Sequence, residues 1–266
     1  MKYSVVIPTF NRPELLKRLL KSIGEQSIPP QEVVILNDGR VLNETESNYS
    51  DLLLKATKLT LVQDGKNLGG PARRNQGVKL AGTEFVFIVD DDDYWMSNLS
   101  EEFDRYINER VHAPFGMICA WAFRETHLGA QSLMKSPIDP LHAERFYREI
   151  LKVNFVPSPT VCVVKSAFEE VGGYDEKLVS AQDWDLWVRL AEKFKCHMIP
   201  KTLAIHSEHE GERISTSSKR FDGYKAFYRK HVMKYVKLGS PEHLARALFF
   251  IATPAKLIPK IKSVVK

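Results

Sequence analysis

The stretch Phe85-Val86-Phe87-Ile88-Val89-Asp90-Asp91-Asp92-Asp93 decides the fold of this 266-residue chain. Its five apolar residues indicate a buried strand, and four carboxylates follow them directly. Neighbouring carboxylates repel one another unless a cation is near, and hard oxygen ligands of this kind suit Mg²⁺ or Mn²⁺. The stretch therefore predicts a strand that ends in a metal-binding turn at a sheet edge. A solvated acidic turn is the alternative.

Strands and helices alternate on both sides of this stretch. Before it, we expect strands over residues 4–7, 32–36 and 59–63, and helices from Pro13 and over residues 50–58 and 71–80. After it, we expect strands over residues 116–123, 160–165 and 198–205, and helices that begin at Ser166 and Ser180. Such alternation is typical of an α/β fold with a mostly parallel sheet and helices on both faces.

The chain is long enough for one large domain with an extension. We expect a domain over residues 1–217, made of halves 1–95 and 96–217, and a helical C-terminal extension over residues 218–266. Hydrophobic residues make up 44% and charged residues 27%, which is an ordinary globular composition. Disordered, collagen-like and coiled-coil chains are thereby excluded.

Positive charge is concentrated in the last part of the chain. The net charge is +5, yet residues 219–266 alone carry twelve basic and two acidic side chains, interleaved with aromatic and aliphatic ones. This mixture predicts amphipathic helices that lie on an anionic membrane surface. Helices that pack on the first domain with a solvated basic face are the alternative, and we expect no nucleic-acid partner.

The cysteines and the termini indicate the compartment. Cys119, Cys162 and Cys196 are odd in number and widely spaced, as expected of free thiols in a reducing cytosol rather than of a zinc site. The N-terminal apolar stretch is too short for a signal peptide, and no apolar stretch is long enough to span a bilayer. We expect a cytoplasmic protein, peripheral on the cytoplasmic face of the membrane.

Polar loops follow three of the expected parallel strands. They are Thr9-Phe10-Asn11-Arg12, Asn37-Asp38-Gly39 and Asp90-Asp91-Asp92-Asp93. In an open α/β sheet, ligands bind outside the carboxyl ends of the strands, so these loops are expected to converge on one site.

Five segments, in this order, resemble the motifs of family 2 glycosyltransferases with the GT-A fold. They are VVIPTFNR (5–12), EVVILNDG (32–39), NLGGPARRNQG (67–77), FIVDDDD (87–93) and QDWDLW (182–187), and the resemblance runs from residue 3 to about residue 215. It implies an inverting transferase that moves a hexosyl or N-acetylhexosaminyl group in polysaccharide biosynthesis. The absence of a Gln-x-x-Arg-Trp motif indicates addition of single sugars rather than processive synthesis.

The resemblance also implies a nucleotide-sugar donor, specifically a UDP-sugar, and a site for it. Thr9 and Asp38 would bind the base, and Arg74 would lie near the base, ribose or pyrophosphate. Asp90 would face the ribose, and Asp92 with His209 would bind Mn²⁺ or Mg²⁺, although His206 remains a second candidate. The rest of the implied donor site is Pro8, Asn11, Arg12 and Asp91.

Asp183 is the expected general base, which takes the proton of an acceptor hydroxyl as it attacks. The acceptor would be a lipid-linked or cell-surface glycan precursor. The alternative role of Asp183 is to cap a helix from its third position, with Ser180 as its partner. For the whole chain, the alternatives are an Asp-x-Asp phosphatase and a catalytically impaired sugar-nucleotide-binding or membrane-adaptor protein. Asn37 and Arg40 replace the Asp and Ser that are usual in the family.

Overall fold

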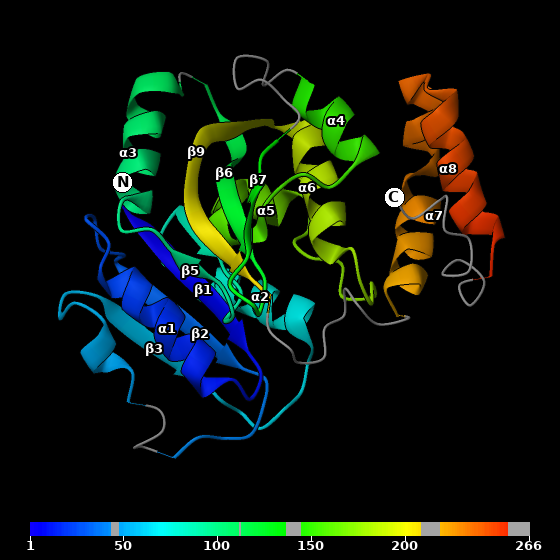
Figure 1. The fold of residues 1–266 in the computed structure, drawn as a ribbon. Helices are drawn as coiled ribbons and strands as arrows, with labels where there is room; N and C mark the ends of the chain where they lie inside the picture. The colour runs from blue at the N-terminus through cyan, green and yellow to red at the C-terminus, as the bar shows by residue number, and fades with distance from the viewer. Residues whose placement is uncertain (44–47, 112, 137–144, 209–218, 255–266) are drawn as a thin grey trace.

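The computed structural model describes residues 1–43, 48–111, 113–136, 145–208 and 219–254. Within these ranges the strands form one curled, nine-stranded sheet with helices on both faces (Figure 1). The strand order is β3-β2-β1-β4-β8-β6-β9-β5, and β7 pairs with β6 outside this path. The α/β fold with helices on both faces is therefore confirmed.

The first four strands are parallel, as their buried apolar runs predict. They are β1 (Tyr3–Thr9), β2 (Glu32–Asn37), β3 (Lys58–Val62) and β4 (Phe85–Ile88). In β1, Val5 lies opposite Val33 of β2 and Phe87 of β4. Parallel strands that are covered on both faces need apolar side chains in both directions, and β1 and β2 are buried throughout.

The second half of the sheet is mixed rather than parallel. Its strands are β5 (Tyr94–Trp95), β6 (Phe115–Glu125), β7 (Gln131–Met134), β8 (Cys162–Val164) and β9 (Lys195–Ser207). β8 runs antiparallel to both β4 and β6, whereas β6 and β9 are parallel. β5 pairs antiparallel with β9, so the acidic turn that joins β4 to β5 passes from the centre of the sheet to its far edge.

Two hydrophobic cores lie on the two faces of the sheet. One contains the helices α1 (Pro13–Gly24) and α3 (Leu99–Arg110). The other contains α2 (Gly70–Leu80), α4 (Phe146–Lys152), α5 (Lys165–Glu170), α6 (Gln182–Lys193), α7 (Lys219–Leu238) and α8 (Pro241–Ala252). Side chains of β1 alternate between them: Val5 and Ile7 belong to the first core, and Val6 belongs to the second.

In the C-terminal segment, residues 219–252 contain the helices α7 and α8, whose aromatic side chains are part of the protein core, and residues 255–266 lie outside the described residues. Phe227 stacks on Trp184 of α6 with ring centroids 4.1 Å apart, and Tyr228 stacks on Phe250 of α8 at 5.0 Å. The helices α7 and α8 therefore pack on the first domain, and contact with a membrane stays a prediction. Among the described residues, no helix is long and apolar enough to cross a membrane.

A buried carboxylate fastens α7 to α6. Asp185 is fully buried and accepts hydrogen bonds from Arg189 Nε at 2.8 Å, Lys230 Nζ at 3.0 Å and His231 Nε2 at 2.8 Å. Burial alone would raise the pKa of this carboxyl, but its cationic and hydrogen-bonding partners hold the pKa well below the usual range. The two helices are thus joined by a charged cluster as well as by aromatic packing.

Three local predictions were wrong. The expected helix over residues 50–58 is only the short 3₁₀ turn η1 (Ser50–Leu52), because the backbone of Leu53 is extended, and β3 begins at Lys58. Ser166 lies inside α5 and donates to Glu84 instead of capping the helix. A second 3₁₀ turn, η3 (Ser158–Thr160), occupies the start of the strand expected at residues 160–165.

We predict that Gly77→Ala destabilises the protein. A Cβ at Gly77 of α2 would overlap Val6 Cγ1 of β1 and lie 2.8 Å from Leu36 Cδ2 of β2. Overpacking of this kind costs about 1–3 kcal/mol, which exceeds the gain of up to about 1 kcal/mol from the better helix propensity of alanine. Chemical denaturation measures the difference in the free energy of unfolding.

The double variant Gly77→Ala/Val6→Ala is the control, because it removes the overlapping methyl groups. Its loss of stability should be smaller than the sum of the two single losses. An increase in stability of Gly77→Ala, or simple additivity in the double variant, contradicts the close approach of α2 to the sheet.

Candidate active site

A cleft of about 630 Å³ lies at the carboxyl ends of the parallel strands. Most of the predicted site residues line it, although they come from distant parts of the chain: Pro8, Thr9, Arg12, Asp38, Arg74, Asp90, Asp91, Asp92 and Asp183. Asn11 is not among the lining residues, and His209 lies outside the described residues. The convergence of the three polar loops is as expected from the topology.

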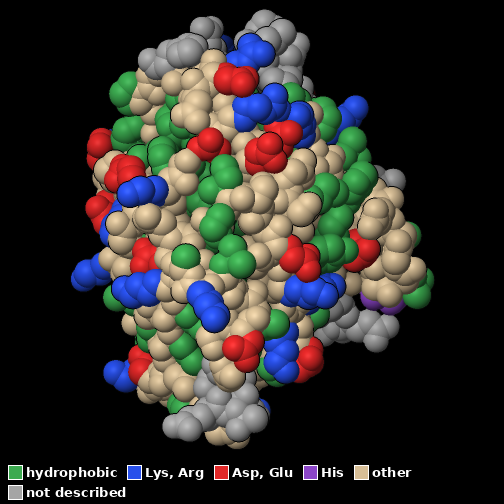
Figure 2. Space-filling model, turned by 90° about the vertical axis from the view of Figure 1, so that its left-hand side faces the viewer, with side chains coloured by type: hydrophobic (Ala, Val, Ile, Leu, Met, Phe, Trp, Pro, Cys, Tyr) green, Lys and Arg blue, Asp and Glu red, His purple; other side chains and the backbone are tan. Residues whose placement is uncertain are grey.

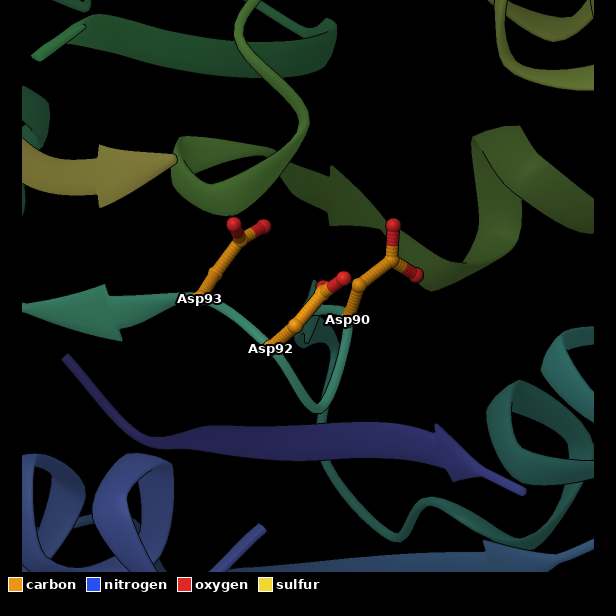
Figure 3. Close-up of side chains that lie close together, drawn as sticks. All are labelled: Asp90, Asp92 and Asp93. Carbon is orange, nitrogen blue, oxygen red and sulfur yellow. The ribbon is translucent and has the colours of Figure 1, made fainter. Parts of the chain in front are cut away.

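The turn Asp90–Asp93, here called the aspartate turn, gathers three carboxylates. One oxygen from each of Asp90, Asp92 and Asp93 lies within 4.8 Å of the others, and Figure 3 shows their side chains rising on the same side of the turn. Asp93 is fully buried, and its Oδ2 has no hydrogen-bond partner among the described residues. A hard divalent cation is the ligand that this set of carboxylates fits.

His206 lies directly beside the aspartate turn. Its Nδ1 is 3.0 Å from Asp93 Oδ1, which also accepts a hydrogen bond from the Ser207 backbone N–H. Burial alone would lower the pKa of His206, but the hydrogen bond and the charge of Asp93 raise it above its usual value. Burial also raises the pKa of the Asp93 carboxyl. His206, the second candidate for the metal site, lines the cleft.

Asp91 has a different environment from its neighbours in the aspartate turn. It is buried, accepts a 2.6 Å hydrogen bond from Thr9 Oγ1 and lies 3.2 Å from Arg12 NH1. Burial raises the pKa of this carboxyl to about 6. Asp91 therefore ties the end of β1 to the turn, and Arg12 also reaches Asp92 at 3.3 Å.

Two adjacent arginines of α2 neutralise the acidic loops. Arg74 forms an ion pair with Asp90 and lies over the ring of Tyr174, 5.5 Å from its centroid. Burial would raise the pKa of Asp90, but Arg74 outweighs burial and lowers it. Arg73, which sequence reasoning missed, is fully buried and bonds Asp38 at 2.8 Å and Asp64 at 2.6 Å. In the sequence, the adjacent pair Arg73-Arg74 within a short helix could have indicated Arg73 as a site residue.

Asp38 is already well supplied with donors. Besides Arg73, the backbone N–H groups of Leu68 and Gly69 donate to its two oxygens at 2.7 and 2.8 Å. Asp38 thereby holds the start of α2 against the end of β2, and its contact with a nucleotide base stays a prediction. Asn11 has a left-handed backbone, with φ of 55°, and its Oδ1 accepts from the Arg40 backbone N–H. It shapes the loop next to the cleft.

Asp183 lies in the first turn of α6, across the cleft from the aspartate turn. Its Oδ2 accepts a 3.0 Å hydrogen bond from Asn154 Nδ2, and burial raises the pKa of its carboxyl. Ser180 does not cap this helix, because the N-cap is Ala181 and the Ser180 hydroxyl donates to the Arg220 carbonyl. A carboxyl with a raised pKa is a stronger base than a free aspartate. Nothing in the sequence marked Asn154 as its partner.

Residues 4–170 match the model of glycosyl transferase family 2. The putative colanic acid biosynthesis glycosyl transferase WcaA of Escherichia coli is 29% identical over 238 residues, which cover 87% of this chain and 82% of WcaA. The crystal structure of Staphylococcus aureus TarS 1-349 in complex with UDP-GlcNAc has a TM-score of 0.68 at 20% identity, covering 100% of this chain and 80% of that chain. Mannosyltransferase PcManGT from Pyrobaculum calidifontis, in complex with GDP-Man and Mn²⁺, has a TM-score of 0.62 at 17% identity, covering 99% and 80%.

We predict that Asp92→Ala weakens the binding of Mn²⁺ at least tenfold. The substitution removes one of the three clustered carboxylates, so the cation loses one of the oxygen ligands that it prefers. Isothermal titration of Mn²⁺ into the protein measures the affinity. Asp51→Ala, at an exposed aspartate of η1, is the matched control and should bind Mn²⁺ as the wild type does. Equal affinity of wild type and Asp92→Ala would show that the aspartate turn is not the metal site.

Proposed function

This chain belongs to glycosyl transferase family 2, and we propose that it transfers single sugars from a UDP-sugar to a hydroxyl group of a glycan acceptor, with inversion at the anomeric carbon. One observation carries the proposal. A partly buried carboxylate with a raised pKa, Asp183, lines the same cleft as Asp90 and Asp92. A base and an acidic metal-binding turn that face one space are the two parts that such a transfer requires.

The donor would lie on the side of the aspartate turn. The names of the structural neighbours support this class of donor, since TarS is in complex with UDP-GlcNAc and PcManGT with GDP-Man and Mn²⁺. A divalent cation held by Asp92, with Asp90 and Asp93 beside it, would neutralise the charge that develops on the leaving diphosphate. Arg12 and His206 add positive charge at the same place, because both line the cleft next to these carboxylates.

Asp183 would act on the acceptor. Its Oδ2 is held by Asn154, and we assign Oδ1 to receive the proton of the attacking hydroxyl group. The oxygen then bonds to the anomeric carbon while the bond to the diphosphate breaks on the opposite face, so the configuration inverts. The hydrogen bond from Asn154 keeps the carboxylate in place between turnovers.

The acceptor would be a lipid-linked glycan precursor, and the reaction would take place on the cytoplasmic face of the membrane. The name of WcaA, a putative glycosyl transferase of colanic acid biosynthesis, supports a role in polysaccharide assembly. Basic residues of α7 and α8, together with the exposed side chains of Met233, Val236 and Leu248, would contact anionic lipid. On the face shown in Figure 2, acidic and basic side chains are intermixed.

We predict that Asp183→Asn keeps the affinity for UDP but lowers the rate of sugar transfer by about 10²–10⁴-fold, the contribution of a positioned general base. Glu192→Gln, the same chemical change at an exposed position of α6, is the matched control and should keep the rate. UDP binding is measured by calorimetry and transfer by chromatography of the product. If UDP affinity collapses while transfer by bound enzyme persists, Asp183 is not the base.

We predict that the protein co-sediments with vesicles containing phosphatidylglycerol at low salt and is released at high salt, because exposed charges are screened there. Met233→Ser/Val236→Ser should reduce the bound fraction, since both side chains are exposed apolar groups on α7. Protein that stays in the supernatant at low salt contradicts membrane contact, and leaves the assignment of the cleft unaffected.

A further inference from the structure

Arg124, near the end of β6, is a cationic residue of the donor cleft that the proposed function does not use. It lines the cleft together with Asp92 and His206. In the pairing of β6 with β9 it lies opposite His206, whose ring reaches Asp93 of the aspartate turn. Paired residues of neighbouring strands point to the same face of a sheet, so the side chain of Arg124 lies on the side where His206 meets the turn.

Two other arginines line the cleft among the described residues, and carboxylates of the same cleft engage both. Arg12 reaches Asp91 at 3.2 Å and Asp92 at 3.3 Å. Arg74 forms an ion pair with Asp90. The charge of each of these two guanidinium groups is therefore balanced by the protein before a ligand binds.

The charge of Arg124 is balanced only loosely. Its Nε lies 3.8 Å from Oε1 of Glu208, which is beyond hydrogen-bond distance. Glu208 is not among the described residues that line the cleft, and about half of the Arg124 side chain is exposed to solvent. An ion pair of this length and exposure contributes little free energy, so an anion that enters the cleft can take its place.

The backbone that carries Arg124 is held from both sides. At this residue β6 pairs with β7 along one edge and with β9 along the other. The next residue, Glu125, accepts hydrogen bonds from Tyr94 Oη at 3.0 Å and from Gln131 Nε2 at 2.9 Å. A fixed strand thus presents the guanidinium group to the cleft, which lowers the entropic cost of binding a ligand with it.

We propose that Arg124 binds the diphosphate of the donor and stabilises it as the leaving group. The inference rests on the proposed function, because that function places the diphosphate beside the aspartate turn. When the bond between the anomeric carbon and the diphosphate oxygen breaks, its electron pair stays on the oxygen, so the diphosphate gains one negative charge. A guanidinium group pairs with phosphate oxygens through two parallel hydrogen bonds, and this contact strengthens as the charge develops.

Binding of inorganic pyrophosphate in the presence of Mg²⁺ tests this contact without the base or the sugar of the donor. By calorimetry, we expect Arg124→Gln to weaken the binding of pyrophosphate and of UDP about 10–100-fold, the effect of a charge-assisted contact. The affinity for uridine, which lacks phosphate, should be unchanged. Arg124→Lys keeps the charge without the fork of donors and should lose less, and it replaces Arg124→Gln if that variant does not fold. Wild-type affinity of the Arg124 variant for pyrophosphate and UDP overturns the proposal.

Two further variants separate ligand binding from a structural role of the ion pair. Glu208→Gln removes the carboxylate near Arg124 but leaves the guanidinium group, so this variant should bind pyrophosphate at least as tightly as the wild type. Arg148→Gln, at an exposed arginine of α4, is the matched control and should bind as the wild type does. If Glu208→Gln weakens pyrophosphate binding as much as Arg124→Gln does, the ion pair serves the structure alone and the proposal is overturned.

The rate of transfer gives a second readout. Because the diphosphate carries more charge in the transition state than in the bound donor, Arg124→Gln should lower kcat at least tenfold at saturating donor. An unchanged kcat at saturating donor overturns the stabilisation of the leaving group by Arg124.

The failure of this inference is distinguishable from the failure of the proposed function. If the wild type binds pyrophosphate but not UDP, the proposed donor is wrong, and the pyrophosphate titrations still test Arg124. If UDP binds and Asp183→Asn loses transfer, but Arg124→Gln binds both probes as the wild type does, only this inference is wrong. If the wild type binds neither probe, the cleft is not a diphosphate site and both proposals are wrong.

Discussion

Burial of carboxylates at one edge of the sheet is the constraint on which the rest of this structure depends. Taking such a group out of water costs several kcal/mol unless positive charge or hydrogen bonds replace the water. Asp38, Asp91 and Asp93 are buried and Asp90 is partly buried, and each has a cationic partner from another element: Asp38 with Arg73, Asp90 with Arg74, Asp91 with Arg12, and Asp93 with His206. The start of α2, the loop after β1 and the end of β9 are therefore fixed relative to the aspartate turn by electrostatics as well as by packing.

Some carboxylates of the proposed active site lack part of this stabilisation by positive charge and hydrogen bonds. Asp92 is only partly buried, and the second oxygen of Asp93 has no partner among the described residues. A cation bound with the proposed diphosphate donor would complete the charge balance of the turn. Across the cleft, burial raises the pKa of Asp183 although Arg74 acts to lower it, and a raised pKa suits a base. Ion pairs with cationic side chains thus hold the framework together, whereas the proposed base depends on burial.

Much of this arrangement could be predicted from the sequence, and the exceptions have physical reasons. The apolar run at residues 85–89 and the carboxylates after it predicted both the strand and the cluster, because burial and charge repulsion are local properties. The position of His206 beside the aspartate turn was not a local property: it depends on the pairing of Tyr94 with Ile205, which brings β9 to the turn. Arg73 lies on a short helix whose apolar periodicity is weak, so its inward direction could not be predicted. The aromatic residues of α7 have the spacing of a membrane-binding face and of a core-facing one, and only the presence of Trp184 opposite them decides between the two.

The stacking of Trp184 on Phe227 also has a consequence for how the protein is made. The helix that carries Asp183 is synthesised some forty residues before the helix that covers it, and domains begin to fold while the chain is still emerging from the ribosome. Until α7 arrives, Trp184 of α6 lacks the ring of Phe227 that stacks on it. A nascent chain that has already assembled the donor half therefore completes the packing around Trp184 only after α7 has been synthesised.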